Sequence, residues 1–247
     1  MIRRMILLAG MAAVYAPAQA PEEPFALIRL IRRPPLPADT DQISEYAKSQ
    51  AGVNVFGMNS VSGPAETWFI EGHDSFASIE AVDTALANAR RESAPLAIPD
   101  AVPLMSSAIA LYLPGLSYRP EEAIKLLPKA RYLNIAVYRI RAGMEAEFSE
   151  LMRTRRRALD AVNLDRPEIA YRVISGAPAG TYIVVSPLTS LKLMDNGLAR
   201  NPAYANALAE VPTPTDGSRI QILFRLEPRS SYVSDDIAAQ DSGFWRR

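Results

Sequence analysis

The sequence contains no cysteine and a single histidine, His73, among its 247 residues. A chain without thiols cannot use cysteine nucleophiles, iron–sulfur clusters or cysteine-ligated zinc, and it forms no disulfides. One histidine nearly excludes a Ser-His-Asp triad and excludes a metal site built from several histidines. We therefore expect no metal centre and a fold that depends on its hydrophobic core alone.

The chain also lacks an excess of charge of either sign, with 27 basic and 27 acidic residues. No dense basic run suits the phosphates of a nucleic acid, so we expect no nucleic-acid partner. Hydrophobic residues make up 49% of the chain, which is enough for one large or two small packed domains. Beyond residue 20 no apolar run is long enough to cross a bilayer, so we expect no stable membrane span in the mature protein.

The first 20 residues have the pattern of a secretory signal peptide. Arg3 and Arg4 supply a positive start, residues 5–16 are apolar, and the Ala-Gln-Ala sequence at 18–20 is a small-x-small cleavage site. A membrane-anchoring helix is the weaker interpretation, because the apolar run is shorter than the ~20 residues that a span requires. We expect cleavage after Ala20 and a periplasmic or secreted mature protein.

One stretch of sequence occurs twice, at residues 67–87 and again at 181–199. Each copy starts with a short aromatic and aliphatic run, turns, and enters a helical pattern with an aspartate near its middle. Residues 78–83 align with 190–195 without gaps, whereas the first copy carries two extra residues at its turn, near Gly72. An internal echo of this kind indicates that one supersecondary unit is used twice.

Hydrophobic periodicity and turn residues divide the chain into two similar halves. Each half has the order strand, helix, strand, strand, helix, strand, which is the split-βαβ arrangement of a ferredoxin-like unit. We place the first unit at 25–118, the second at 131–232, and a flexible tail at 233–247. The expected strands are 25–32, 53–58, 67–71, 107–113, 132–141, 168–175, 181–186 and 218–227, and the expected helices are 39–50, 75–90, 145–162 and 189–199.

The repeated strand–helix segment and the matching last strands, 107–113 and 218–224, resemble the dimeric α/β-barrel superfamily. The resemblance covers residues 25–232. It implies an α+β fold in which two ferredoxin-like units in tandem pack sheet to sheet as an intramolecular barrel. Members of this superfamily include small-substrate monooxygenases, haem-binding and haem-degrading proteins, and exported bacterial proteins without an assigned role. The second half is most similar to that last group.

His73 is the first candidate for chemistry, because Glu71 and Asp74 flank it where a strand gives way to a helix. A neighbouring carboxylate orients an imidazole, so His73 could serve as a general base or a haem ligand. The alternative is a turn histidine that caps the helix or lies in solvent. Haem-degrading members of the superfamily use a helix histidine and a first-strand asparagine within one unit, but Asn134 lies in the other unit. We therefore expect an exposed His73, no stoichiometric haem and no cofactor.

Arg155 is the second candidate, because helical spacing places it on the apolar stripe of its helix with Met152 and Leu159. An inward arginine needs a carboxylate or an anionic ligand, since an unpaired buried charge is costly. Asp195 lies beside an inward stripe of its own helix, and Asp83 is its counterpart in the first copy. These residues indicate a charged pair at the wall of a pocket, a structural Arg–Asp bridge, or an arginine that reaches solvent at the helix edge.

Polar residues on the strands of the second half suggest a lining for the barrel. Gln221 alternates with apolar residues in the last strand, and Arg172 and Tyr138 contribute polar groups on other strands. If this face points into the shared barrel, the interior is mixed polar and suits a small polar ligand. Trp68 and Tyr182 occupy the same repeat position, and we expect both to pack inside the protein.

Two functions fit the sequence. The first is a non-catalytic binding or scaffold protein, with a small molecule as its ligand, because residue types used in catalysis are sparse. The alternative is a cofactor-independent, small-substrate monooxygenase-like enzyme with a pocket between helices and sheet. An enclosed cavity of a few hundred Å³ favours the enzyme, whereas filled cores favour the binding protein. The sequence leaves the oligomeric state open.

Overall fold

The computed structural model describes residues 21–35, 52–92, 105–164, 166–195 and 215–246, together with 202 and 206. The signal-peptide segment at 1–20, the helix expected at 39–50 and the end of the helix expected at 189–199 lie outside the described residues.

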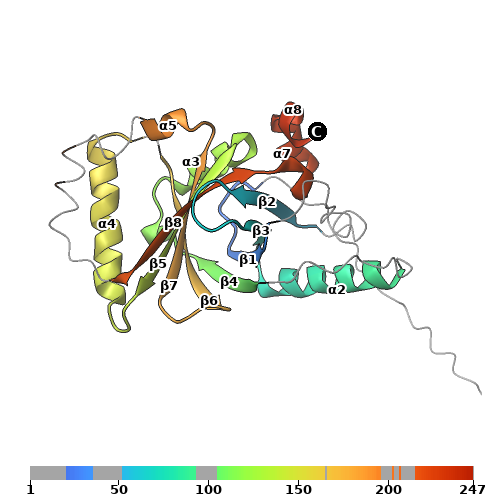
Figure 1. Cartoon of the computed structure of the whole chain (residues 1–247), viewed down its shortest axis with the longest axis horizontal. Coiled ribbons are helices and arrows are strands. Elements are labelled where there is room, and N and C mark those ends of the chain that lie inside the picture. Colours follow the sequence, from blue (N-terminus) through green and yellow to red (C-terminus); the bar gives the residue numbers. More distant parts are fainter. Residues whose placement is uncertain are drawn as a thin grey trace, which may run out of the picture.

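Eight strands of the described chain form a closed antiparallel barrel (Figure 1). The order around the barrel is β1-β3-β2-β8-β5-β7-β6-β4, and β4 pairs with β1 to close it. The strands are β1 (Leu27–Arg33), β2 (Asn54–Ser60), β3 (Thr67–His73), β4 (Ser106–Tyr112), β5 (Tyr132–Ile140), β6 (Ile169–Ser175), β7 (Thr181–Leu188) and β8 (Thr215–Leu226).

The strands of each half stay together in the barrel. The first half has the order β4-β1-β3-β2 and the second has the order β8-β5-β7-β6. The halves meet where β2 pairs with β8 and where β4 pairs with β6. They therefore join edge to edge in one barrel, whereas the sequence suggested that they pack sheet to sheet. Edge pairing satisfies the backbone groups that each four-stranded run would otherwise leave unpaired.

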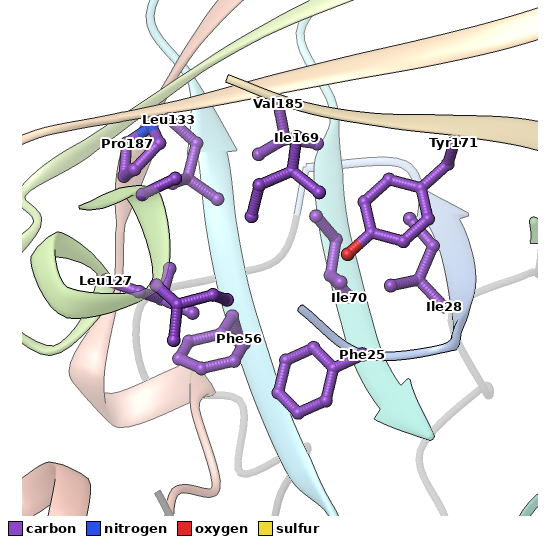
Figure 2. A pocket seen from close by; sticks show the side chains of 12 residues that line it. Phe25, Ile28, Phe56, Ile70, Leu127, Leu133, Ile169, Tyr171, Val185 and Pro187 are labelled. Carbon is purple, nitrogen blue, oxygen red and sulfur yellow. The ribbon is translucent and has the colours of Figure 1, made fainter. Parts of the chain in front are cut away.

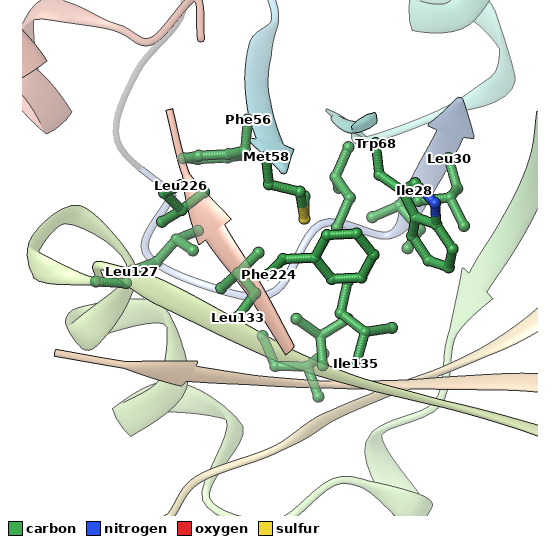
Figure 3. Close-up of a cluster of buried hydrophobic side chains, with 14 of the residues drawn as sticks. Ile28, Leu30, Phe56, Met58, Trp68, Leu127, Leu133, Ile135, Phe224 and Leu226 are labelled. Carbon is green, nitrogen blue, oxygen red and sulfur yellow. The ribbon is translucent and has the colours of Figure 1, made fainter. Parts of the chain in front are cut away.

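The interior of the barrel is one apolar cluster. It includes Ile28, Phe56, Trp68, Leu133 and Phe224, which come from five different strands (Figure 3). The rings of Trp68 and Phe224 lie 4.6 Å apart between their centroids. Since these residues are spread over both halves, the two halves share one core.

The expected polar lining of the barrel interior is wrong. Ile222 belongs to the interior cluster, so the adjacent Gln221 lies outside and is exposed. Tyr138 also lies outside, with its ring centroid 5.4 Å from that of Phe148, and Arg172 is exposed. The choice of face depends on the pairing register, which sequence periodicity does not supply.

Two long helices lie outside the barrel on different sides of it, α2 (Phe76–Glu92) and α4 (Glu145–Ala161) (Figure 1). Val82 and Leu86 of α2 pack against Phe69, and Met152 of α4 packs against Tyr182. The shorter elements are α3 (Pro120–Leu126), α5 (Lys192–Asp195), α7 (Asp235–Gln240) and α8 (Ser242–Trp245), with 3-10 turns η1 (Pro114–Leu116), η2 (Leu127–Lys129) and η4 (Pro228–Ser230). Among the described residues, no helix combines the length and apolarity needed to span a membrane.

Residues 233–246 are folded, so the expected flexible tail is not what the structure shows. Ile237 of α7 and Trp245 of α8 are 0% and 7% exposed and belong to the barrel cluster. Trp245 Nε1 donates a hydrogen bond of 2.6 Å to the backbone oxygen of Pro128, and its ring meets Phe56 edge-on. The sequence does not predict this packing, because the few large apolar residues of this segment lie among many polar ones and give no periodic pattern.

The two copies of the repeat are offset by one residue in the structure. Trp68 lies inside the barrel, whereas Tyr182 lies outside beneath α4. Ile70 and Val185 both face the interior, although Ile70 is two residues after Trp68 and Val185 is three residues after Tyr182. A shift of one residue moves every side chain of a strand to the other face. Both aromatic residues are buried, but on opposite faces of the barrel wall.

Candidate functional site

A cluster of polar side chains lies on the outer face of β1 and β3, beside the start of α2. Arg29 of β1 stands opposite Glu71 of β3, and His73 follows on the same face of β3. The side chains of Glu71 and His73 are both 0% exposed, and that of Arg29 is 15% exposed. Groups this deeply buried require hydrogen-bond partners.

Hydrogen bonds connect the cluster from its centre to the surface. Glu71 Oε2 accepts from Arg29 Nε and lies 3.3 Å from His73 Nε2. His73 Nδ1 lies 3.1 Å from the hydroxyl oxygen of Ser78. Arg29 Nη1 donates to Asp83 Oδ1 over 2.6 Å, and the Asp83 side chain is 57% exposed. We call these five residues the β3–α2 cluster.

The contacts of His73 indicate which ring nitrogen carries the proton. A carboxylate only accepts hydrogen bonds, so Nε2, which faces Glu71, carries the hydrogen in the neutral ring. Nδ1 then has a free lone pair and accepts from the Ser78 hydroxyl. In this arrangement His73 can take a proton from Ser78 or from a molecule beside it, and Glu71 stabilises the imidazolium that forms.

Arg29 supplies a permanent positive charge beside Glu71. Burial acts to lower the pKa of Arg29, but attraction and hydrogen bonding to Glu71 and then Asp83 outweigh burial, so the pKa is raised. The guanidinium therefore remains charged and favours the carboxylate form of Glu71. The carboxylate form of Glu71 accepts the stronger hydrogen bond from an Nε2–H group of His73.

The expected exposure of His73 is wrong, because β3 extends to this residue and its side chain points beneath α2. Gly72 lies on the barrel side of the strand, where a Cβ would approach the ring of Phe25 to 2.5 Å. The glycine therefore permits close packing within a strand. In the sequence the same glycine is a turn signal, and a turn at Gly72 led to the wrong prediction that His73 is exposed.

The described surroundings of His73 do not fit a haem iron. Both ring nitrogens face protein groups, Ser78 on one side and Glu71 on the other, and the side chain is enclosed. A proximal histidine needs one nitrogen directed at the iron. The β3–α2 cluster is arranged for proton transfer.

Arg155 points inward, as its place on the helix predicts, and it pairs with Glu168. The guanidinium contacts both carboxylate oxygens, with 2.6 Å between Nη2 and Oε1. The two side chains are 11% and 5% exposed. Asp195 is exposed, so the expected charged wall of Arg155 and Asp195 is wrong. The Arg155–Glu168 pair ties α4 to the start of β6.

Arg172 lies apart from the β3–α2 cluster, on the outer face of β6. It stands opposite Tyr182 in the ladder with β7. Burial raises the pKa of Tyr182, and Arg172 acts in the opposite direction. Of the residues that the sequence singled out, the structure brings His73 and Asp83 into one cluster and leaves Arg155, Asp195 and Arg172 in the second half.

Arg29 and Ser78 are members of the cluster that sequence analysis missed. Alternation along β3 was a usable signal for Glu71, since residues two apart share a face. No local signal points to Arg29, because its contact with Glu71 joins residues 42 positions apart. Ser78 appears in the sequence only as part of a helix start.

Two hollows lie at the barrel. One, inside it, has a volume of about 30 Å³ and apolar walls (Figure 2). The other is an open surface groove of about 350 Å³, lined by Arg131, Tyr132, Arg225, Leu226, Glu227, Pro228, Arg229 and Phe244. Small-molecule sites typically have volumes of ~300–1,000 Å³, so of these two only the groove reaches that size.

No protein-family model and no curated protein matches the chain. Solved structures do match it. A candidate monooxygenase from Fusobacterium nucleatum aligns with a TM-score of 0.54 and 8% identity, over 82% of this chain and 93% of that one. An anthrone oxidase-like protein aligns with a TM-score of 0.51 and 10% identity, over 81% of this chain and 91% of that one. A mutant chlorite dismutase from Candidatus Nitrospira defluvii aligns with a TM-score of 0.51 and 12% identity, over 87% of this chain and 95% of that one.

The structural neighbours are dimeric α/β-barrel proteins, and this chain has their mixed fold of antiparallel strands and covering helices. At 8–12% identity the similarity shows the fold alone. The activity must therefore be argued from the residues of this chain.

Proposed function

We propose that the protein is an enzyme that oxidises a small organic molecule without a bound cofactor, in the manner of a monooxygenase. The observation that carries this proposal is the contact chain Ser78–His73–Glu71, in which a buried imidazole has a carboxylate on one nitrogen and a hydroxyl on the other. This is the geometry of a general base, with Glu71 as the group that orients it. Ser78 is half-buried at the start of α2 and is the accessible end of the chain.

The fold does not need a polar residue at the position of His73. If Ile70 and Val185 are equivalent in the two halves, His73 corresponds to Leu188, which is 0% exposed and apolar. An apolar side chain thus fills the same place in the second half. Burial of an imidazole and a carboxylate in the first half carries a desolvation cost that packing alone does not explain. Buried titratable groups with a specific charged partner are candidates for functional sites.

In the proposed reaction, a substrate with an activated CH₂ group binds at Ser78. Its proton leaves through the Ser78 hydroxyl, which passes its own proton to His73 Nδ1. The carbanion then reduces dioxygen directly. One CH₂ group and one O₂ give one carbonyl group and one water, and all four electrons come from the substrate. No external reductant is therefore needed. Proton removal by a positioned base contributes typically ~10²–10⁴-fold to such a rate.

Fold similarity supports this chemistry as a precedent. The neighbours include proteins described as a candidate monooxygenase and as anthrone oxidase-like, which are built on the same barrel. We further propose that the barrel arose by tandem duplication of a ferredoxin-like unit. The equal strand order in the two halves supports a duplication.

We also propose that the chain is exported and that residues 1–20 are removed after Ala20. The basic start, the apolar run and the small-x-small sequence support export. Mass spectrometry of the natively expressed protein should find Pro21 as its first residue. An intact Met1 would contradict export.

The second candidate function is a non-catalytic binding protein. The specific observation in its favour is the small size of the interior cavity, about 30 Å³, which leaves the barrel core almost filled. In that case the β3–α2 cluster has a structural role only, and a ligand uses the surface.

The test is oxygen uptake by the purified mature chain with anthrone-type substrates, in the presence of a chelator and without flavin or nicotinamide. We expect one O₂ consumed per carbonyl formed, and a fall in kcat of about 10²–10⁴-fold in His73→Gln. Asp74→Asn is the matched control, because Asp74 is an exposed carboxylate next to His73 that makes none of the cluster contacts. Equal turnover in wild type and His73→Gln would reject His73 as the base, and no turnover over the substrate panel would favour the binding protein.

A further inference from the structure

The cavity inside the barrel has walls from both halves of the chain. Phe25, Ile28, Phe56 and Ile70 come from the first half, and α3 and η2 close it from the linker between the halves. Its full lining is Phe25, Ile28, Phe56, Ile70, Ala123, Ile124, Leu127, Leu133, Ile169, Tyr171, Val185 and Pro187. All of these residues are buried, so the cavity lies in the barrel core, although it is not fully enclosed.

One polar side-chain group faces this apolar space. Tyr171 is 3% exposed, and Figure 2 shows its hydroxyl oxygen directed among the apolar side chains of the wall. Within the described part of the chain, no hydrogen-bond partner of this hydroxyl is found. Burial strongly raises the pKa of Tyr171, so the phenol is neutral and can donate one hydrogen bond.

The size and walls of the cavity restrict what it can hold. A water needs two to four polar partners, and the side chains of the wall offer a single hydroxyl. An apolar cavity of ~150 Å³ accommodates benzene or xenon, so a volume of about 30 Å³ leaves room for one atom or one diatomic molecule. The occupant that fits is therefore small, uncharged and weakly polar.

We propose that this cavity is a binding site for one dioxygen molecule. The assignment to dioxygen rests on the proposed oxygen-dependent function, whereas the affinity for a small apolar molecule follows from the cavity alone. Ile70 lines the cavity from β3, and Glu71 and His73 lie on the opposite face of the same strand. The cavity and the β3–α2 cluster are thus separated by the thickness of one strand.

Dioxygen is paramagnetic and can serve as its own probe. We would record methyl relaxation by NMR in methyl-labelled mature protein under oxygen pressure. Methyl groups of Ile70 and Val185 should relax at least threefold faster than those of Val82 and Val184. The control methyls are similarly buried: Val82 and Val184 are 4% and 3% exposed, and Ile70 and Val185 are 6% and 7% exposed. Val82 lies on the inner face of α2 and Val184 lies beneath α4, so neither lines the cavity. Equal relaxation in both groups would overturn the proposal.

Two variants change the cavity in opposite directions. Val185→Ile adds a methyl group to the wall and should reduce the relaxation at Ile70, whereas Ile169→Val enlarges the cavity and should increase it. Val137→Ile is the matched control, since Val137 packs against the same core but does not line the cavity. Xenon titration of the same variants should follow the same order. Xenon uptake without oxygen enrichment would contradict the assignment to dioxygen.

The two proposals fail separately. A lack of oxygen enrichment at Ile70 rejects the cavity site whatever the turnover. An enriched cavity in a protein whose His73→Gln variant turns over normally rejects the proposed role of His73 and keeps the cavity site.

Discussion

Glu71 is a fully enclosed carboxylate, and its contacts include Arg29 and His73. Buried ion pairs add little net stability, because the loss of hydration offsets the attraction. Removal of one partner is different, since it leaves the other charge buried without compensation. We therefore expect the loss of one charged residue of the β3–α2 cluster to destabilise the protein more than the loss of both partners.

Replacement of Glu71 with glutamine should lower the free energy of unfolding by about 2–4 kcal/mol, because Arg29 keeps only Asp83 as its partner. The double variant Arg29→Met with Glu71→Gln should recover much of this loss, since no buried charge is left. Urea denaturation of both variants measures the difference. A Glu71→Gln protein as stable as wild type would contradict the burial of this charge.

Glu66 predicts how stability responds to acid. Hydrogen bonding from Arg32 holds the pKa of this carboxyl below its ordinary value of 4.5, against the opposing effect of burial. Trp68 Nε1 donates a further hydrogen bond of 2.6 Å to it. A depressed folded-state pKa stabilises the protein above pH 4.5, and this stabilisation is lost as the pH falls below it.

Melting temperatures between pH 7 and pH 3 should therefore converge for wild type and Glu66→Gln at the acid end. At neutral pH we expect the variant to be about 1 kcal/mol less stable, a modest value because the Arg32 side chain is 37% exposed. A constant difference between the two melting temperatures at every pH would show that the ionisation of Glu66 does not contribute to stability.

The sequence identified some residues of the site and missed others. His73 stood out because it is the only histidine, and its carboxylate neighbours were adjacent in sequence. Its burial was missed because Gly72, a turn signal, in fact packs within a strand. Arg29 was missed because cross-strand contacts between distant residues leave no local pattern.

At the scale of elements, hydrophobic periodicity located the long ones well. The helix expected at 145–162 is observed at Glu145–Ala161, and the strand expected at 132–141 is observed at Tyr132–Ile140. Short elements with few apolar residues were missed. α7 and α8 together carry Ile237, Phe244 and Trp245 among polar residues, which is too little for a periodic signal.

Trp245 should be the residue that fixes these two short helices. Trp245→Ala removes a large ring from the barrel cluster and its bond to Pro128, so we expect a loss of about 3–5 kcal/mol in unfolding free energy. Arg246→Ala is the control, because Arg246 is exposed and its pair with Asp235 is a surface contact. Thermal melts that rank the two variants equally would mean that the C-terminal helices do not stabilise the barrel.

At the scale of the whole molecule, one closed barrel unites both halves. The similarity of the two halves was predicted from the sequence, but the way the halves join was not. Edge pairing of β2 with β8 and of β4 with β6 depends on register, and the repeat alignment was off by one residue in β3 and β7. A period-2 pattern identifies two faces without telling which one points inward.

Separated halves should not be stable alone. Chains covering 21–118 and 131–247 each leave two strand edges unpaired and half of the shared core exposed, so we expect aggregation or partial folding of either one. Refolded together they should form a one-to-one complex with the summed mass of the two fragments. Size-exclusion chromatography with light scattering provides the measurement. A monomeric, cooperatively folded single half would contradict the shared core.

The central claim is that Glu71 holds His73 as a general base, with Nε2 protonated and Nδ1 open to Ser78. Because the chain has one histidine, long-range ¹H–¹⁵N correlation NMR of the labelled ring reports on His73 without any mutant. At mildly alkaline pH we predict the Nε2–H tautomer, with a shift toward a mixture of tautomers in Glu71→Gln. A ring protonated at Nδ1 in the wild type would place its donor, and not its lone pair, toward Ser78 and would contradict the claim.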